Sequence, residues 1–193
     1  KRVLFIVNAE WYFCLHWLPL AIGMVKNGYE IILASSDEKG ERKNIEEAGI
    51  KFIEMPFQRQ SINPIREIKS FIEIIRIIKQ TRPNIVHNIT IKPVILGTLA
   101  SRILSMPFIV NSITGLGYTF IRPGLFGLLL RNVIKFIYRI LFKRKRLMVT
   151  FQNSDDRRLL YSNRRSFPKS AIVIKGGGVN TTKYKLTPIP VDT

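Results

Sequence analysis

Short apolar segments alternate with helix-forming segments along this chain, and no other feature of the sequence restricts the fold as much. Residues 3–7 form an apolar run without a polar residue, which is typical of a strand buried on both faces of a parallel sheet. Further strands are predicted at 29–34, 51–54, 84–87, 108–111, 147–151 and 171–174. Helices are predicted at 15–26, 41–48, 64–81, 93–104 and 154–161, with one more inside 122–146. This order predicts an α/β fold, a doubly wound parallel sheet of about seven strands with flanking helices.

The composition narrows the kinds of partner and site. A net charge of +18 on 193 residues favours anionic partners such as nucleic acid, acidic lipid or a diphosphate. An apolar content of 46% is enough for a real core and indicates a folded domain. The single cysteine, Cys14, excludes an internal disulfide and a thiolate zinc cluster. No group of His, Asp and Glu has metal-ligand spacing, so we expect no metal.

The stretch 122–146 holds eight basic residues and no acidic one. Arg131, Lys135 and Arg139 are four residues apart, so they share one face of a helix whose other faces are apolar. Such a helix can lie in a membrane interface and pair with anionic headgroups, or it can pack on the sheet with a solvated basic face. It is a poor membrane span, because these cations would sit at bilayer depth. The candidate membrane contacts are Arg131, Lys135, Arg139, Lys143, Arg144, Lys145 and Arg146.

Ligands of a doubly wound sheet bind beyond the carboxyl ends of its strands. The loops to consider are therefore 8–15, 88–92, 112–120 and 175–180. The first of these has no glycine, and its bulky aromatic residues would block close approach of a pyrophosphate. This argues against an NAD oxidoreductase, and the P-loop pattern is absent as well.

The first loop offers aromatic ring faces instead of glycines. Trp11, Tyr12 and Phe13 can stack on a sugar or a lipid, or they can cover an edge of the core. His16 is predicted in the first turn of the first helix, where it can face the same cleft. Glu10 is the only carboxylate of this loop.

The segment after the fourth strand carries a hydroxyl and a cation beside a helix N-terminus. Thr90 and Lys92, together with the helix dipole, suit a phosphate or diphosphate. The alternative is a capping threonine and a solvated lysine. His87, inside the strand itself, is expected to be a hydrogen-bonded core residue rather than a catalyst.

Two glycine-bearing segments also follow strands. Gly115 and Gly117 allow backbone N–H groups to point at a ligand oxygen. Gly176, Gly177 and Gly178 form either a phosphate-facing loop or a flexible exit from the last strand.

Seven pieces of the chain, in this order, resemble a known family and together cover nearly all of it. They are VLFIVNAEWYFCLHWLPLA, GYEIILAS, GIKFIEMPFQRQSINP, RPNIVHNITIKPVILGTLAS, NSITGLGYTF, VTFQNSDDR and IKGGGVN. The ordered set resembles the N-terminal half of a GT-B fold glycosyltransferase of family 4, the retaining type. It is most similar to bacterial enzymes that elongate undecaprenyl-diphosphate-linked sugars for capsule, O-antigen or other polysaccharide assembly.

The resemblance implies a Rossmann-like acceptor-binding domain at 1–184 and, at 185–193, a linker toward an absent C-terminal domain that binds the donor. It implies a peripheral protein on the cytoplasmic, inner face of the membrane. Its partners would be a lipid-diphosphate-linked saccharide acceptor, a nucleotide-sugar donor and an anionic membrane surface. The nucleotide-sugar is a co-substrate, and no resident cofactor is expected. Without the donor domain, we expect the chain alone to be inactive as a hexosyl or N-acetylhexosaminyl transferase.

The resemblance also assigns some residues. Glu10 and His16 match the acceptor region of the first loop. Related enzymes carry a second histidine after the fourth strand, and this chain does not, which leaves Thr90 and Lys92 as candidates there. The catalytic residues are not identified. Retention without an obvious nucleophile implies that donor phosphate and acceptor hydroxyl meet face to face.

Two other interpretations stay open at this stage. The chain can be a non-catalytic subunit that docks a separate donor-binding chain onto the membrane. It can also bind nucleic acid, but only the charge suggests this and no recognition motif is present, so we expect no nucleic-acid partner.

Overall fold

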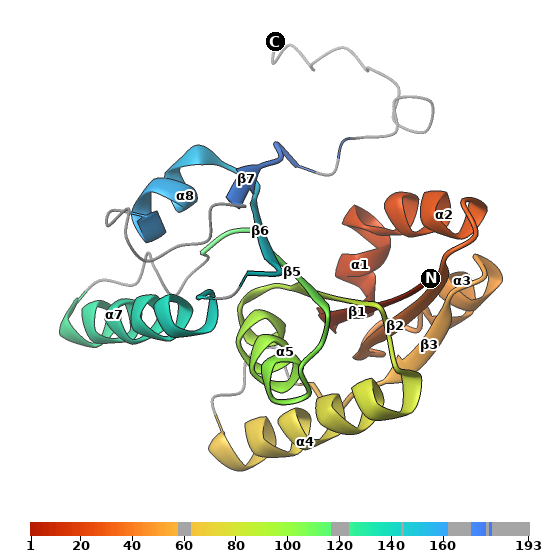
Figure 1. The fold of residues 1–193 in the computed structure, drawn as a ribbon, viewed down its shortest axis with the longest axis horizontal. Coiled ribbons are helices and arrows are strands. Elements are labelled where there is room, and N and C mark those ends of the chain that lie inside the picture. The colour runs from red at the N-terminus through yellow and green to blue at the C-terminus, as the bar shows by residue number, and fades with distance from the viewer. Residues whose placement is uncertain (58–62, 117–123, 144, 162–170, 177, 179–193) are drawn as a thin grey trace, which may run out of the picture.

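The computed structural model describes residues 1–57, 63–116, 124–143, 145–161, 171–176 and 178, shown as a ribbon in Figure 1. In this part of the chain, seven parallel strands form one sheet in the order β3-β2-β1-β4-β5-β6-β7. The predicted α/β, doubly wound parallel sheet is confirmed. The strands are β1 (Arg2–Ala9), β2 (Glu30–Ser36), β3 (Lys51–Glu54), β4 (Ile85–Ile89), β5 (Phe108–Ile113), β6 (Leu147–Phe151) and β7 (Ala171–Val173). The helices are α1 (Glu10–His16), α2 (Leu18–Lys26), α3 (Arg42–Glu47), α4 (Pro64–Thr81), α5 (Ile91–Ile103), α7 (Gly124–Leu141) and α8 (Ser154–Tyr161).

Helices cover both faces of the sheet and enclose a core on each side. The first three helices lie on one face, and α4, α5 and α7 lie together on the other (Figure 1). The side chains of β1 point alternately to the two sides. Phe5 belongs to the core that includes Phe13 of α1 and Ile45 of α3, whereas Ile6 belongs to the core that includes Ile74 of α4. A strand buried on both faces needs apolar residues at every position, which explains its continuous apolar run.

The two halves of the sheet diverge at its centre, between β1 and β4. After β1 the chain adds β2 and β3 on one side, and it then returns to add β4 to β7 on the other. Every pair is parallel, so all strands end at the same edge of the sheet. The segments after β1 and β4 therefore flank the switch point, where doubly wound folds bind ligands. The outermost strands are the shortest, with four residues in β3 and three in β7.

The loop predicted at 8–15 is wrong. β1 continues to Ala9 and α1 begins directly at Glu10, so the aromatic residues belong to a helix. The helix predicted at 15–26 is divided at Trp17 into α1 and α2. Pro19 explains the division, because its ring inside one continuous helix would clash with the carbonyl four residues earlier. His16 therefore ends α1 instead of lying in the first turn of a helix.

The segment after β4 is shorter than predicted. β4 extends to Ile89 and α5 begins at Ile91, so Thr90 alone connects them. Pro93 is the third residue of α5, where it is tolerated because the first four N–H groups of a helix have no partner within it. β5 likewise extends further than predicted, which places Ser112 in the sheet.

Helix α7 packs on the sheet, and its outward face is apolar. Ile134, Tyr138 and Leu141 are buried in the core beneath it. Arg131, Lys135 and Arg139 are partly exposed along one flank of the helix, and their contact with a membrane stays a prediction. Exposed apolar side chains occupy the outward face: Leu125, Leu128, Leu129, Val133, Phe136 and Ile140.

The residues that follow α7 continue its positive charge. Lys143, Lys145 and Arg146 are exposed, whereas Arg144 lies outside the described residues. Within the described part of the chain, no helix combines the length and the apolar character needed to cross a bilayer.

Tyr138 gives a test of the core under α7. Its side chain is fully buried and stacks on Phe142, with ring centroids 4.9 Å apart, and burial raises the pKa of its hydroxyl. That hydroxyl has no hydrogen-bond partner among the described residues. Because an unpaired buried hydroxyl is unfavourable, we expect Tyr138→Phe to leave the free energy of unfolding unchanged or raise it by up to ~1 kcal/mol. Urea denaturation checks this, and a loss of more than ~1 kcal/mol would contradict it.

Candidate functional site

Glu10 opens α1 beside the switch point and is fully buried. Its two carboxylate oxygens accept hydrogen bonds from the backbone N–H groups of Glu38, at 2.9 Å, and of Lys39. Both N–H groups belong to the segment that follows β2. The carboxylate therefore ties that segment to the start of α1, and we infer a structural role in addition to the predicted one in acceptor binding.

The three aromatic residues of α1 are not equivalent. Phe13 is buried in the core, as the alternative interpretation expected. Trp11 and Tyr12 are partly exposed. The ammonium of Lys39 lies 4.9 Å from the centre of the Trp11 ring, and the Tyr12 and His16 rings are 4.5 Å apart. The exposed ring faces at this edge of the sheet therefore come from Trp11, Tyr12 and His16.

Thr90 has an unusual backbone conformation at the carboxyl end of β4. Its φ of 74° and ψ of 167° fall in a region that only glycine adopts without strain. Its N–H donates to the Ser112 carbonyl at 3.3 Å. It occupies the N-cap position of α5, yet its side chain makes no capping hydrogen bond, so the interpretation of a capping threonine is wrong. The buried hydroxyl oxygen has no partner among the described residues.

Lys92 lies in the first turn of α5 and is not a solvated lysine. Its ammonium contacts the Glu67 carboxylate of α4 at 2.6 Å, and only 22% of its side chain is exposed. The ion pair joins the first turns of two neighbouring helices at the edge of the sheet where the strands end. Any anion bound here would share this ammonium with Glu67.

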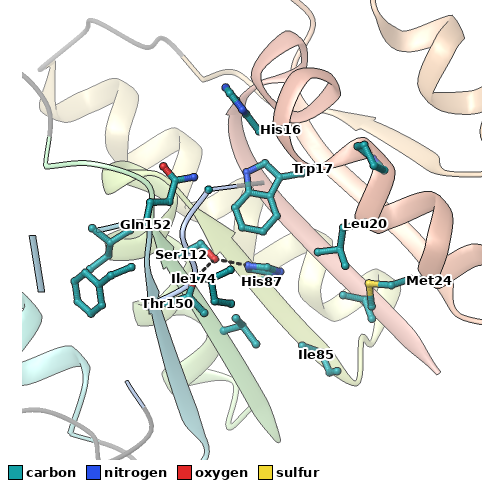
Figure 2. A pocket seen from close by; sticks show the side chains of 16 residues that line it. His16, Trp17, Leu20, Met24, Ile85, His87, Ser112, Thr150, Gln152 and Ile174 are labelled. Carbon is teal, nitrogen blue, oxygen red and sulfur yellow. Dashed lines mark hydrogen bonds between the residues drawn. The ribbon is translucent and has the colours of Figure 1, made fainter. Parts of the chain in front are cut away.

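A pocket of 460 Å³ lies on the α1 and α2 side of the sheet. Figure 2 shows its wall, with His16 and Gln152 toward one end and Met24 and Ile85 toward the other. The pocket brings His16 and Gly176 together from distant parts of the chain. The full lining is Val3, His16, Trp17, Pro19, Leu20, Met24, Ile85, His87, Val110, Ser112, Ile113, Thr150, Phe151, Gln152, Ile174 and Gly176.

A chain of hydrogen bonds crosses three strands in the wall of this pocket. Nε2 of His87 lies 2.7 Å from Oγ of Ser112, which lies 2.7 Å from Oγ1 of Thr150 (Figure 2). The rings of Phe5 and Trp17 pack on the imidazole. Burial lowers the pKa of His87 to about 3, so the imidazole is neutral near pH 7. His87 is thus the hydrogen-bonded core histidine that its strand position predicts.

The remaining candidate residues do not gather in this pocket as His16 and Gly176 do. Gly115 has a φ of 137°, and Gly176 and Gly178 have φ values of 69° and 76°, which other residues rarely adopt. Gly117 and Gly177 lie outside the described residues. Thr90 and Lys92 do not line the pocket. Burial raises the pKa of the Cys14 thiol to about 12, so it is not a ready nucleophile.

Sequence reasoning did not single out Trp17, Thr150 or Gln152 as pocket residues, and it named Ser112 only as the first residue of the segment 112–120. Ser112 and Thr150 carried a weak signal, because a hydroxyl inside a buried strand needs a partner. Their pairing becomes visible only with the strand register, in which these two residues face each other on β5 and β6. The predicted absence of a metal and of a resident cofactor stays a prediction.

The chain has relatives among known proteins. Residues 2–153 match the family described as glycosyl transferase 4-like. The sequence is also similar to the N,N'-diacetylbacillosaminyl-diphospho-undecaprenol alpha-1,3-N-acetylgalactosaminyltransferase of Campylobacter jejuni, with 26% identity over 155 residues. That similarity covers 79% of this chain and 40% of the relative.

Solved structures share the fold. A glycosyltransferase from Rickettsia africae is similar with a TM-score of 0.66 and 21% identity, over 97% of this chain and 46% of that one. Anabaena Alr3699/HepE in complex with UDP and glucose gives 0.65 and 12% identity, over 97% and 47%. MurG of Acinetobacter baumannii gives 0.54 and 15% identity, over 96% and 48%. The chain therefore spans less than half the length of each of these proteins.

Proposed function

Since the chain belongs to the glycosyl transferase 4-like family, we propose that it is the acceptor-binding half of a retaining glycosyltransferase. The enzyme moves a sugar from a nucleotide-sugar to a saccharide carried on a membrane lipid diphosphate. The name of the Campylobacter relative describes transfer to a sugar on diphospho-undecaprenol, which supports this class of acceptor. The complex of the Anabaena protein with UDP and glucose supports a nucleotide-sugar donor.

The observation that carries the proposal is Thr90 at the switch point of the sheet. A strained residue persists where the surrounding structure forces it, and such strain gathers at ligand sites. Here it holds a hydroxyl that has no partner among the described residues, beside the N-terminus of α5, where the helix dipole favours an anion. In the proposal this end of α5 receives the acceptor, and Thr90 donates to a hydroxyl or phosphate oxygen of the acceptor.

In this proposal, the other candidates at the same edge of the sheet contribute to the acceptor site. Trp11, Tyr12 and His16 are partly exposed and offer ring faces on which the sugar stacks. Lys92 contributes positive charge that it shares with Glu67. The backbone near Gly115 supports the acceptor from the β5 side. Gly176 and Gly178 follow β7, and in the proposal they face the donor diphosphate.

In this proposal the nucleotide-sugar binds to the part of a full-length family member that this chain does not span. His87 is neutral and packed between rings, so the proposal gives it no part in proton transfer. The configuration of the transferred sugar is retained because the acceptor hydroxyl attacks on the face from which the diphosphate departs. The departing diphosphate takes the proton of that hydroxyl. The protein contributes orientation and stabilises the diphosphate. This chain alone does not complete the reaction.

Helix α7 holds the protein on the inner face of the membrane in this proposal. Its outward apolar face enters the interface, and the cations on its flank and beyond its end pair with anionic headgroups. Each well-placed Lys or Arg adds roughly 1 kcal/mol to such binding. The acceptor lipid lies in the same interface, so docking brings the acceptor to the edge of the sheet.

The test is a transfer assay on the polypeptide as it is isolated from its own cells. Radiolabelled nucleotide-sugars are offered one by one with vesicles that hold polyprenyl-diphosphate-linked saccharides. We expect label in the lipid fraction with one donor. The isolated polypeptide can instead prove to have the length of this chain, to bind vesicles, and to transfer label only after a second protein is added. That result would support the non-catalytic docking subunit. The proposal would be contradicted if no donor gave labelled lipid, with or without a second protein, and if the polypeptide bound vesicles equally well with and without the lipid-linked saccharide.

Variants at Thr90 distinguish a role of this residue in acceptor binding from a role in folding. Glycine relieves the strain of a positive φ, so Thr90→Gly is expected to raise the free energy of unfolding by up to ~1 kcal/mol. The same change removes the hydroxyl and is expected to lower transfer by roughly tenfold or more, as loss of one polar contact does. Thr90→Ser keeps the hydroxyl and should keep most of the activity. Full activity of Thr90→Gly would remove Thr90 from the site.

A further inference from the structure

Helix α4 carries an exposed face that combines isoleucines with cations. Ile65, Ile68 and Ile72 are 66%, 58% and 58% exposed, which is unusual for three isoleucines on one helix. Positions 65, 68, 72, 76 and 79 follow one another at spacings of three or four. Position 69 lies four residues after 65 and three before 72, so all six share one face. The cations on it are Lys69, Arg76 and Lys79, all exposed. We call these six residues the α4 face.

No carboxylate belongs to the α4 face. The acidic residues of α4 are Glu67 and Glu73. Glu67 points toward α5, where it pairs with Lys92, and Glu73 lies 3.7 Å from Arg76 at the border of the face. Ile74, Ile77 and Ile78 on the opposite side already fill the core. The exposed isoleucines are therefore surplus to folding, and a cationic apolar face is the pattern of a surface that meets anionic lipid.

The α4 face lies on the same side of the sheet as α7, with α5 between the two helices (Figure 1). Both neighbours are bonded to α5. Lys92 of α5 pairs with Glu67 at the start of α4, and the guanidinium of Arg102 donates to the carbonyls of Ile140 and Leu141 at the end of α7. The three helices thus form one layer, in which α5 fixes the position of α4 relative to α7.

We propose that the α4 face docks on the same anionic bilayer as α7, so that the protein rests on the membrane through two helices. This inference rests on the proposed membrane role of α7. One amphipathic helix in an interface leaves the domain free to roll about the helix axis. A second line of contact removes that freedom and sets the angle between the sheet and the bilayer. The net charge of +18 disfavours a second copy as the occupant, because two cationic faces would repel each other.

The test uses the chain in the Cys14→Ser background with an environment-sensitive dye on one new cysteine. The three labelled variants are Ile72→Cys on α4, Phe136→Cys on α7, and Ile172→Cys as the control. Ile172 is also exposed, but it pairs with Thr150 on the pocket side of the sheet. Vesicles are phosphatidylcholine with or without phosphatidylglycerol. We expect a blue shift of the dye at positions 72 and 136 with anionic vesicles, and none at 172.

A flotation assay with the double variant Ile68→Glu/Ile72→Glu gives a second measurement. We expect its partition onto anionic vesicles to fall by about tenfold or more, since two apolar contacts become repulsive charges. Ile172→Glu should float like the unaltered chain. Circular dichroism shows whether each variant is folded, and the dye measurement needs no acidic substitution in α4.

The outcomes separate the inference from the proposal on which it rests. A blue shift at 136 without one at 72 would overturn the α4 contact and leave α7 as the docking helix. No shift at either position would overturn both. A dye response at 72 that appears without vesicles and grows with protein concentration would show that a second copy covers the α4 face, and the inference would be wrong.

Discussion

Gly97→Ala is expected to destabilise the protein by about 3 kcal/mol, which is toward the upper end of what overpacking a core costs. Gly97 lies in α5 against the side chain of Asn88, which is fully buried in β4. A Cβ at position 97 would lie 1.9 Å from Oδ1 of Asn88 and 2.7 Å from its Cγ. Asn88 cannot easily move aside, because its Nδ2 donates to Oδ1 of Asn111, which also accepts from Thr98. Urea denaturation measures the loss.

Gly23→Ala in α2 is the matched control. A Cβ there would meet nothing within 4 Å, so only the helix preference of alanine should act, raising stability by up to ~1 kcal/mol. Adding Asn88→Ala to Gly97→Ala should recover part of the loss, because the clash is then relieved. Equal and small effects of Gly23→Ala and Gly97→Ala would show that α5 does not approach β4 so closely.

The pH dependence of stability is expected to carry a contribution of about 2 kcal/mol from His87 between pH 7 and pH 5. Burial lowers the pKa of His87 to about 3, whereas an unfolded histidine titrates near 6.5. At pH 7 the folded protein is unprotonated at His87, and the unfolded chain is mostly so. As the pH falls below 6.5, the unfolded chain takes up a proton that the folded protein refuses, so the free energy of unfolding falls with the pH.

Denaturant titrations at pH 7, 6, 5.5 and 5 test this contribution. His87→Asn removes the titrating ring, and the slope that depends on His87 should disappear while the variant stays less stable at pH 7. The loss at pH 7 reflects the missing contacts with Ser112 and Phe5. An unchanged slope in the variant would show that His87 is not the source.

Much of the fold could be predicted from the sequence, because buried parallel strands leave a clear pattern. The apolar run at 3–7 and the long amphipathic helix Pro64–Thr81 were found at nearly their observed positions. The errors came where two elements meet without a connecting loop. Ala9 and Glu10 pass directly from β1 into α1, and Thr90 alone separates β4 from α5. No glycine or run of turn residues marks such junctions.

The site was less predictable, because its geometry depends on distant pairings. The strain at Thr90 has no signature in the sequence, since threonine is not a residue expected at a positive φ. The ion pair between Lys92 and Glu67 depends on the side-by-side packing of α4 and α5. The helical period placed Arg131, Lys135 and Arg139 on one face, but only the sheet beneath α7 decides that this face is a flank.

The shortness of β3 and β7 has a consequence for handling the protein. A sheet rim is a row of unpaired backbone groups on which a neighbouring molecule can add a strand, and aggregation of β-rich chains starts there. With only four and three residues at its two rims, this sheet offers little length for such templating. Aggregation of the purified chain should therefore arise from the exposed apolar faces of its helices, which mild detergent can cover, rather than from strand addition at the sheet edges.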